Sequence, residues 1–337
     1  MELNKIYNEN CMDTVRRMPD GFLNCVVTSP PYFGLRDYGN DDQFGLEETP
    51  EAYVQNLVDL FREIRRALRD DGIVWLNLGD SYASGGTGGC SSKSTLNGGR
   101  GVSDSEKIRV MKQSSRPIPS GMKPKDLIGI PWRVAFALQS DGWYLRQDII
   151  WHKPNPMPES VTDRCTKSHE YIFLLTKSAK YYYDSEAVKE SCITNENRPN
   201  GVVRDREYGY DSKQKAMGRH KNTKEKGQQP HSFRKSREQG TPDATPEKRN
   251  KRSVWTVTTK PYSEAHFATY PEALIIPCIK AGCPEGGIVY DPFGGAGTTA
   301  LVSHKLGRDW VLSELNSEYV TIAEKRLQPY LNQTTLF

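Results

Sequence analysis

Five consecutive residues, Thr28-Ser29-Pro30-Pro31-Tyr32, place a hydroxyl, two prolines and an aromatic ring directly after an apolar run. That run, residues 23–27, ends in two valines and predicts a buried strand. The prolines cannot continue the strand, because proline has no N–H to donate and its φ is fixed. We therefore expect Ser29, Pro30, Pro31 and Tyr32 at a rigid strand end, where open α/β sheets bind ligands.

A second group of functional residue types lies in residues 287–314, where the sequence predicts a strand, a glycine-rich turn, a helix and another strand that ends at Glu314. Glycines allow backbone amides to approach a ligand, and a carboxylate after the next strand can bind a ribose diol. The glycine spacing alone fits NAD as well as S-adenosylmethionine. Asp291 precedes the glycines, where it would repel a pyrophosphate, and the full Gly-x-Gly-x-x-Gly pattern is missing. These two details favour S-adenosylmethionine.

The elements that must position these residues alternate between strand and helix along most of the chain. Expected strands cover residues 5–13, 23–27, 73–78, 143–151, 169–176, 287–291 and 310–313. Expected helices cover residues 14–18, 49–71 with a stop at Gly72, 131–141, 272–279, 300–306 and 316–331. This alternation predicts an α/β fold with a mostly parallel sheet.

Two polar segments interrupt this alternation and divide the chain. Residues 83–123 are rich in Gly and Ser and predict a mobile basic loop. Residues 186–252 hold 17 Lys or Arg against 10 Asp or Glu, in a chain whose formal net charge is only +4. A solvated linker is one interpretation of this insert, and a module that neutralises nucleic-acid phosphates is the other. The expected organisation is a first domain part over 1–185, an insert over 186–252 and a second domain part over 253–337.

Three motifs, residues 28–32 (Thr-Ser-Pro-Pro-Tyr), 291–299 (Asp-Pro-Phe-Gly-Gly-Ala-Gly-Thr-Thr) and 314–319 (Glu-Leu-Asn-Ser-Glu-Tyr), resemble in this order those of the β-class amino-DNA methyltransferases. Residues 80, 151–155 and 266–271 also match strand-end and cofactor motifs of that family. The resemblance implies a circularly permuted Rossmann-like fold that uses S-adenosylmethionine, with helices on both faces of the sheet. It also implies site-specific methylation of duplex DNA, with residues 186–252 as a target-recognition insert.

The resemblance assigns site residues one by one, and the implied catalytic residues are Ser29, Pro30, Pro31 and Tyr32. The implied cofactor-binding residues are Asp291, Pro292, Phe293, Gly294, Gly295, Gly297, Thr298, Glu314, Asn316, His266, Phe267, Ala268 and Asn10. Asn10 stands where many relatives carry an acidic residue, Phe267 could simply pack, and Asp80 could instead cap a helix. The expected DNA-binding residues are Arg36, Lys93, Arg100, Lys153, Arg204, Arg206, Arg219, Arg234 and Arg237.

The motif chemistry suits transfer to an exocyclic amino group, whose nitrogen is a poor nucleophile because its lone pair is delocalised into the ring. Ser29 Oγ and the Pro30 carbonyl can each accept one amino hydrogen and aim the lone pair, while Tyr32 can stack on the base. The base must first be flipped from the duplex. Serine in this motif favours cytosine N4, with adenine N6 as the alternative. Carbon-5 methylation would need an activated cysteine, and Cys278 is expected inside a helix as an inert thiol.

Other classes of function remain to be weighed against this one. They are an NAD-dependent oxidoreductase, a non-catalytic DNA-binding protein, and a methyltransferase of protein glutamine amides, a class that typically has Asn in place of Ser29. His169 and Glu170 lack an apparent third ligand, so no metal is expected. The seven scattered cysteines predict reduced thiols in the cytoplasm, and neither a signal peptide nor an apolar run of the roughly 20 residues that a membrane span needs is expected. A homodimer and a cognate restriction endonuclease are typical partners of this class, and no stretch here specifies either.

Overall fold

The computed structural model describes residues 1–35, 42–83, 118, 121–191, 248–259 and 269–332. The chain divides into a larger unit, residues 1–188 with 251–337, and a smaller unit, residues 189–250. In the described part of the smaller unit, β6 (Glu190–Ser191) pairs antiparallel with β7 (Lys248–Arg249).

The larger unit contains an eight-stranded sheet in the order β1-β10-β9-β2-β3-β5-β4-β8. The strands are β1 (Lys5–Tyr7), β2 (Leu23–Thr28), β3 (Leu68–Leu78), β4 (Tyr144–His152), β5 (His169–Thr176), β8 (Val254–Thr256), β9 (Ile288–Asp291) and β10 (Asp309–Ser313). Among these strands β5 alone runs antiparallel to its neighbours, β3 and β4, and the other pairs are parallel. The prediction of a mostly parallel sheet is confirmed.

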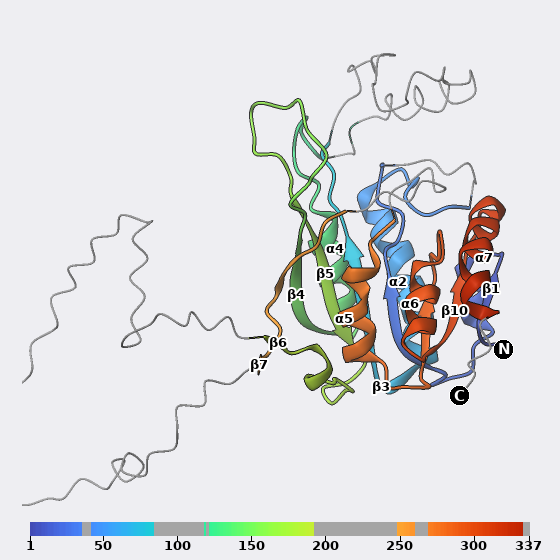
Figure 1. Cartoon of the computed structure of the whole chain (residues 1–337). Helices are drawn as coiled ribbons and strands as arrows, with labels where there is room; N and C mark the ends of the chain where they lie inside the picture. The colour runs from blue at the N-terminus through green and yellow to red at the C-terminus, as the bar shows by residue number, and fades with distance from the viewer. Residues whose placement is uncertain (36–41, 84–117, 119–120, 192–247, 260–268, 333–337) are drawn as a thin grey trace, which may run out of the picture. The chain divides into compact units, whose positions relative to one another are not determined.

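Helices cover both faces of this sheet, as predicted (Figure 1). One face packs on α1 (Cys11–Arg16), α2 (Pro50–Ala67) and α4 (Ile130–Ser140), and the other on α5 (Glu272–Gly282) and α6 (Thr298–Lys305), with α7 (Ser317–Leu331) packed beside α6. Alternate strand residues separate the two cores: Val26 lies in the first, and Cys25 and Val27 lie in the second. Because both faces are covered, the central strands are almost entirely apolar.

Several boundaries differ from the sequence-based expectation, and the strand expected over residues 5–13 already ends at Tyr7. The first helix begins at Cys11 rather than at residue 14, because the Asn10 side chain accepts a hydrogen bond from the Met12 amide at 2.9 Å and caps it. The helix expected to stop at Gly72 ends at Ala67, and Leu68 already pairs with Leu23 in the sheet. Leu68 is fully buried, so its burial in the sheet overrides the glycine stop signal.

In the described part of the chain, none of the helices combines the length and the apolar character needed to cross a membrane.

Candidate active site

The carboxyl ends of β2, β9 and β10 lie side by side at one edge of the sheet (Figure 1). This arrangement brings together motifs that are far apart in the sequence, since the Thr28 hydroxyl donates a 2.8 Å hydrogen bond to Asp291 Oδ1, 263 residues later. Glu314 directly follows β10 at the same edge, and its amide donates to the Tyr7 carbonyl at the end of β1. The predicted catalytic and cofactor motifs therefore share one site.

Asp291 is fully buried and accepts four hydrogen bonds from the protein. Its Oδ1 accepts from the Thr28 hydroxyl and from the Phe293 amide, the latter at 3.0 Å. Its Oδ2 accepts from the Tyr270 hydroxyl at 2.7 Å and from the Thr299 hydroxyl at 2.6 Å. Burial raises the pKa of Asp291, and the four donors act in the opposite direction by stabilising the carboxylate. This carboxylate thus joins β2, the glycine-rich turn, α6 and the segment before α5.

Glu314 is the second carboxylate of the site, it is partly buried, and its geometry suits a diol ligand. Its Oε2 accepts from the Gly295 amide at 2.7 Å and its Oε1 from the Asn316 amide at 2.9 Å. Burial raises the pKa of Glu314, and these two amides oppose that rise. Each oxygen keeps a further lone pair, so both can accept a hydroxyl proton. Gly295 has φ +50°, and among the described residues a Cβ built there would meet only the Phe293 carbonyl, at 4.0 Å.

The rest of the glycine-rich turn is packed against its own scaffold. A Cβ at Gly294 would lie 3.0 Å from the Leu312 Cβ, and one at Gly297 would lie 2.9 Å from the Ala323 Cβ of α7. The Thr298 hydroxyl accepts a 2.9 Å hydrogen bond from Arg326 of α7. These three predicted cofactor residues therefore also hold the turn on β10 and α7.

Aromatic and amide groups border the same turn. Phe293, which Pro292 connects to β9, meets Phe44 edge to face with ring centroids 5.3 Å apart. Asn316 caps α7 by accepting from the Glu318 amide at 2.8 Å. Phe44 was not predicted, because its position in the sequence carries no motif.

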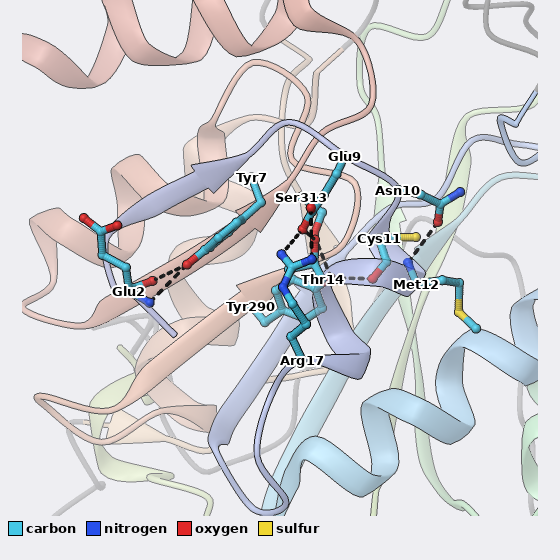
Figure 2. Close-up of polar contacts among 10 residues, drawn as sticks. All are labelled: Glu2, Tyr7, Glu9, Asn10, Cys11, Met12, Thr14, Arg17, Tyr290 and Ser313. Atoms are coloured by element: carbon cyan, nitrogen blue, oxygen red, sulfur yellow. Dashed lines mark hydrogen bonds and ion pairs between the residues drawn. The ribbon is translucent and has the colours of Figure 1, made fainter.

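Asn10 lies in the connection between β1 and α1, and its side chain caps α1 (Figure 2). Its side-chain oxygen faces the Met12 amide, and the Tyr290 hydroxyl bonds Ser313 Oγ at 2.8 Å and donates to the Cys11 carbonyl at 3.4 Å. The start of α1 is thus attached to the ends of β9 and β10. The predicted cofactor contact of Asn10 stays a prediction, and its capping bond is what the structure shows.

The residues of the catalytic motif lie on a chain of hydrogen bonds that the sequence did not suggest. Ser29 Oγ donates to the Tyr32 hydroxyl at 3.3 Å, and Tyr32 donates to Glu170 Oε2 at 2.7 Å. Asn77 Nδ2 also donates to Glu170 Oε2, at 3.2 Å, and Lys153 forms an ion pair with Glu170 Oε1. Burial, followed by the Glu170 carboxylate, raises the pKa of Tyr32 well above its ordinary value. Tyr32 is therefore a neutral phenol, and its hydroxyl proton is donated to Glu170.

The backbone of the motif is fixed from α2. The Tyr53 hydroxyl donates a 2.8 Å hydrogen bond to the Pro31 carbonyl, and Tyr53 is fully buried. Pro30 is buried beside it, which leaves this strand end little freedom to move. Rigid placement of the Pro30 carbonyl is what a positioning role requires.

Gly79, at the end of β3, lies against the ring of Tyr32. A Cβ built at Gly79 would lie 2.4 Å from Tyr32 Cε2, far inside van der Waals contact. We expect Gly79→Ala to displace the Tyr32 ring and lower the rate of methyl transfer by about 10-fold or more, because misplacing a positioning group costs rate even when it does not itself react. Single-turnover kinetics would measure this loss. Gly286→Ala is a control for the added methyl: it lies in a turn where a Cβ meets nothing within 4 Å, although its φ of +70° makes it the more strained backbone site. A smaller effect at Gly79 than at Gly286 would contradict the proposed contact.

Comparison with known proteins decides the family. The model of the N6/N4 DNA methylase family matches residues 23–325. The chain belongs to this family. It is 45% identical over 323 residues to the Type II methyltransferase M.SmaI of Serratia marcescens, covering 96% of this chain and 90% of that protein. It is also 45% identical over 331 residues to M.Cfr9I of Citrobacter freundii, covering 97% and 89%.

Solved structures agree with the family at the level of the fold. PvuII DNA methyltransferase, named as cytosine-N4-specific, superposes with a TM-score of 0.57 at 14% identity and covers 98% of this chain and 91% of its own. A DNA modification methylase of Thermus thermophilus, complexed with S-adenosyl-L-methionine, superposes with a TM-score of 0.52 at 16% identity and covers 97% and 96%. The chain is a DNA methyltransferase with the α/β methyltransferase fold, and its cofactor is S-adenosylmethionine. The oxidoreductase interpretation of the glycine-rich turn is excluded.

Two other residues of this methyltransferase, Asp80 and Cys278, have structural explanations. Asp80 Oδ1 accepts from the amides of Gly129 and Ile130, each at 3.0 Å, so Asp80 caps the start of α4. Cys278 is buried in α5, donates weakly to the Leu274 carbonyl, and has a pKa raised by burial, as expected for an inert thiol. In the part of the chain that the structure describes, no group of three or more His, Cys, Asp or Glu side chains could hold a metal ion.

Several predicted site residues lie outside the described residues. They are Arg36, Lys93, Arg100, Arg204, Arg206, Arg219, Arg234, Arg237, His266, Phe267 and Ala268. Of the predicted DNA contacts only Lys153 is described, and its ammonium is paired with Glu170 and lies 4.2 Å from the centre of the Trp151 ring.

Proposed function

We propose that this methyltransferase modifies cytosine at N4 in specific sites of duplex DNA, with Ser29 as the group that accepts an amino hydrogen. The observation that carries the proposal is the direction of the Ser29 hydroxyl, whose proton is donated to Tyr32 at the strand end beside Glu314 and Asp291. An oxygen whose proton is engaged keeps its lone pairs for an incoming donor. Family members with serine at this position typically act on cytosine N4, and those with Asp or Asn on adenine N6.

The residues around Glu314 fit the cofactor. A partly buried acceptor, the Gly295 amide and the space that the described residues leave beside Gly295 suit a ribose and its attached groups, and Glu314 would hold the two ribose hydroxyls. When bound, S-adenosylmethionine supplies an electrophilic methyl group on a sulfonium. No metal and no covalent enzyme intermediate are needed for this transfer.

The chain's own residues orient the target. Ser29 Oγ and the Pro30 carbonyl each accept one hydrogen of the amino group, which directs the nitrogen lone pair toward the methyl group. This is a positioning effect, and it depends on the strand end that Tyr53 holds through the Pro31 carbonyl. The base has to leave the duplex to reach the site, at a cost of a few kcal/mol that contacts to the pocket and the backbone must offset. Residues 186–252, with their excess of Lys and Arg, are proposed to supply sequence recognition and part of those backbone contacts.

The modified nucleoside tests this assignment directly. The protein is incubated with methyl-labelled S-adenosylmethionine and mixed-sequence duplex DNA, the DNA is digested, and the labelled nucleoside is identified. We expect N4-methylcytosine. Label in N6-methyladenine would overturn the base assignment alone, and absence of label in DNA would overturn the proposed activity.

Relatives named as Type II methyltransferases support a further proposal, that this enzyme protects DNA from a cognate restriction endonuclease. DNA methylated by the protein should resist one endonuclease whose site contains the methylated cytosine. A homodimer stays a prediction.

A further inference from the structure

Glu170 lies beside the catalytic motif although neither its neighbours in sequence nor the family comparison gives it a role. It belongs to β5, the strand that runs antiparallel to β3, so its beginning lies at the edge where the parallel strands end. The side chains of Glu170 and its ion-pair partner Lys153 are only 15% and 18% exposed. An ion pair that is this far buried beside an active site either stabilises the fold or changes the properties of a neighbouring side chain.

The single proton of the Tyr32 hydroxyl has two acceptors within reach, Glu170 Oε2 at 2.7 Å and Asn77 Oδ1 at 3.3 Å, and the shorter contact to Glu170 is the stronger one. An ionised carboxylate has no proton to donate, so the Tyr32 hydroxyl must donate to it, and the short 2.7 Å distance is typical of a charge-assisted bond. The Tyr32 oxygen is then available only as an acceptor, and Ser29 donates to it at 3.3 Å. The Asn77 amide group donates to the same carboxylate oxygen at 3.2 Å and to the Tyr171 carbonyl at 3.1 Å, which fixes the carboxylate in place.

This ordering solves a problem that serine poses in the motif. A hydroxyl can donate or accept a hydrogen bond. If the serine hydrogen pointed at an amino hydrogen of the base, the two hydrogens would repel each other and no hydrogen bond would form. A carboxylate in the same position could only accept. With its proton drawn toward Tyr32, the serine hydroxyl presents lone pairs to the substrate as a carboxylate would.

We propose that Glu170 is a positioning residue that, through Tyr32, orients the Ser29 hydroxyl so that its lone pairs face the amino group of the target base. Lys153 and Asn77 hold the Glu170 carboxylate where Tyr32 can reach it. The inference rests on the hydrogen-bond role proposed above for Ser29. It adds a requirement: the motif needs a carboxylate from β5 in order to work with serine.

A double-mutant cycle tests the inference. Glu170→Gln, Tyr32→Phe and the double variant are compared with the parent by single-turnover methyl transfer at saturating S-adenosylmethionine and DNA. We expect each single variant to lose about 10-fold to 10²-fold in rate, in the range of one lost orienting hydrogen bond to a charged group. The double variant should be no slower than Tyr32→Phe alone, because Glu170→Gln removes the charge that strengthens the bond from Tyr32, and Tyr32→Phe removes that same bond altogether.

Two further measurements distinguish a positioning role of Glu170 from a role in folding: the affinity for the cofactor, and the effect of removing a comparable ion pair. Cofactor affinity by calorimetry and the melting temperature are measured on every variant, and cofactor affinity should stay within about 3-fold, since none of the described hydrogen bonds and ion pairs of Glu170 involves Glu314. Glu159→Gln serves as the control, because Glu159 forms an ion pair with Arg164 in the same β4–β5 connection and both side chains are 27% exposed. It should leave the single-turnover rate unchanged.

Three results would overturn the inference. They are an unchanged rate in Glu170→Gln, independent and multiplicative losses in the double variant, or an equal loss in Glu159→Gln. The role of Ser29 is checked separately: in a Ser29→Ala background, Glu170→Gln should cause almost no further loss. If Ser29→Ala is itself fully active, the proposed role of Ser29 fails; if only Ser29→Ala is slow, the inference about Glu170 fails alone.

Discussion

Ser29→Ala is expected to lose methyl transfer by about 10²-fold to 10³-fold, because an acceptor that aligns the reacting nitrogen acts mainly in the transition state. The substitution removes one oxygen from a partly exposed strand end, and the bond that Ser29 donates, 3.3 Å to Tyr32, is long. We therefore expect little change in stability or in cofactor affinity. The loss should appear in the single-turnover rate, with the dissociation constant for S-adenosylmethionine nearly unchanged.

Ser81→Ala provides the matched control for Ser29→Ala. Ser81 lies at the same edge of the sheet, and its hydroxyl donates a 3.2 Å hydrogen bond to the Phe33 carbonyl just after the catalytic motif. Removing this hydroxyl deletes the same atom type without touching the amino group, and the rate should fall by no more than about 3-fold, given the modest net value of one such bond. Comparable losses in the two variants would mean that Ser29 acts only through the local fold.

Asp291→Ala should destabilise the protein by about 3 to 5 kcal/mol, since it leaves several buried donors without an acceptor. The amide of Phe293 and the hydroxyls of Thr28, Tyr270 and Thr299 all donate to this one carboxylate. Urea denaturation would measure the loss. Cofactor binding should weaken as well, because the glycine-rich turn starts at Asp291.

The variant Asp291→Asn separates the loss of the negative charge from the loss of the hydrogen-bond acceptors. The amide keeps one oxygen for the Phe293 amide and Thr28, and its NH₂ can donate to a hydroxyl that turns round to accept. The expected loss is therefore smaller, about 1 to 2 kcal/mol, in the range for one rearranged buried hydrogen bond. Equal losses in the two variants would show that negative charge, rather than the number of acceptors, determines the stability of this site.

Local pattern was sufficient to predict the ends of the central strands. The apolar run before Thr28 and the run before Asp291 each predicted a strand, and the motifs that follow them lie where the parallel edge requires. The boundary between α2 and β3 was wrong because Leu68 has a partner, Leu23, that lies far away in the sequence. A glycine signal at position 72 could not outweigh that burial.

The partners of the catalytic motif could not be predicted in the same way. Tyr32 and Glu170 are 138 residues apart, and only the antiparallel direction of β5 brings the carboxylate to the correct edge. The one signal that the sequence carried at Glu170 was its place next to a histidine, which pointed toward a metal ligand and lacked a third partner. Asp80 matched a family motif equally well as a ligand contact or a helix cap, and only its three-dimensional contacts with Gly129 and Ile130 show the cap.

The bond between Thr28 and Asp291 has a consequence for how the enzyme matures during translation. Because the groups proposed to hold the base and the cofactor come from opposite ends of the chain, the ribosome synthesises residues 28–32 long before the residues that complete their site. The edge strand β1 likewise cannot join the sheet until its pairing partner β10 has been synthesised. Contacts of this sequence separation slow folding, since a long loop must close before they form. A nascent or truncated chain that ends before residue 291 therefore cannot assemble this site.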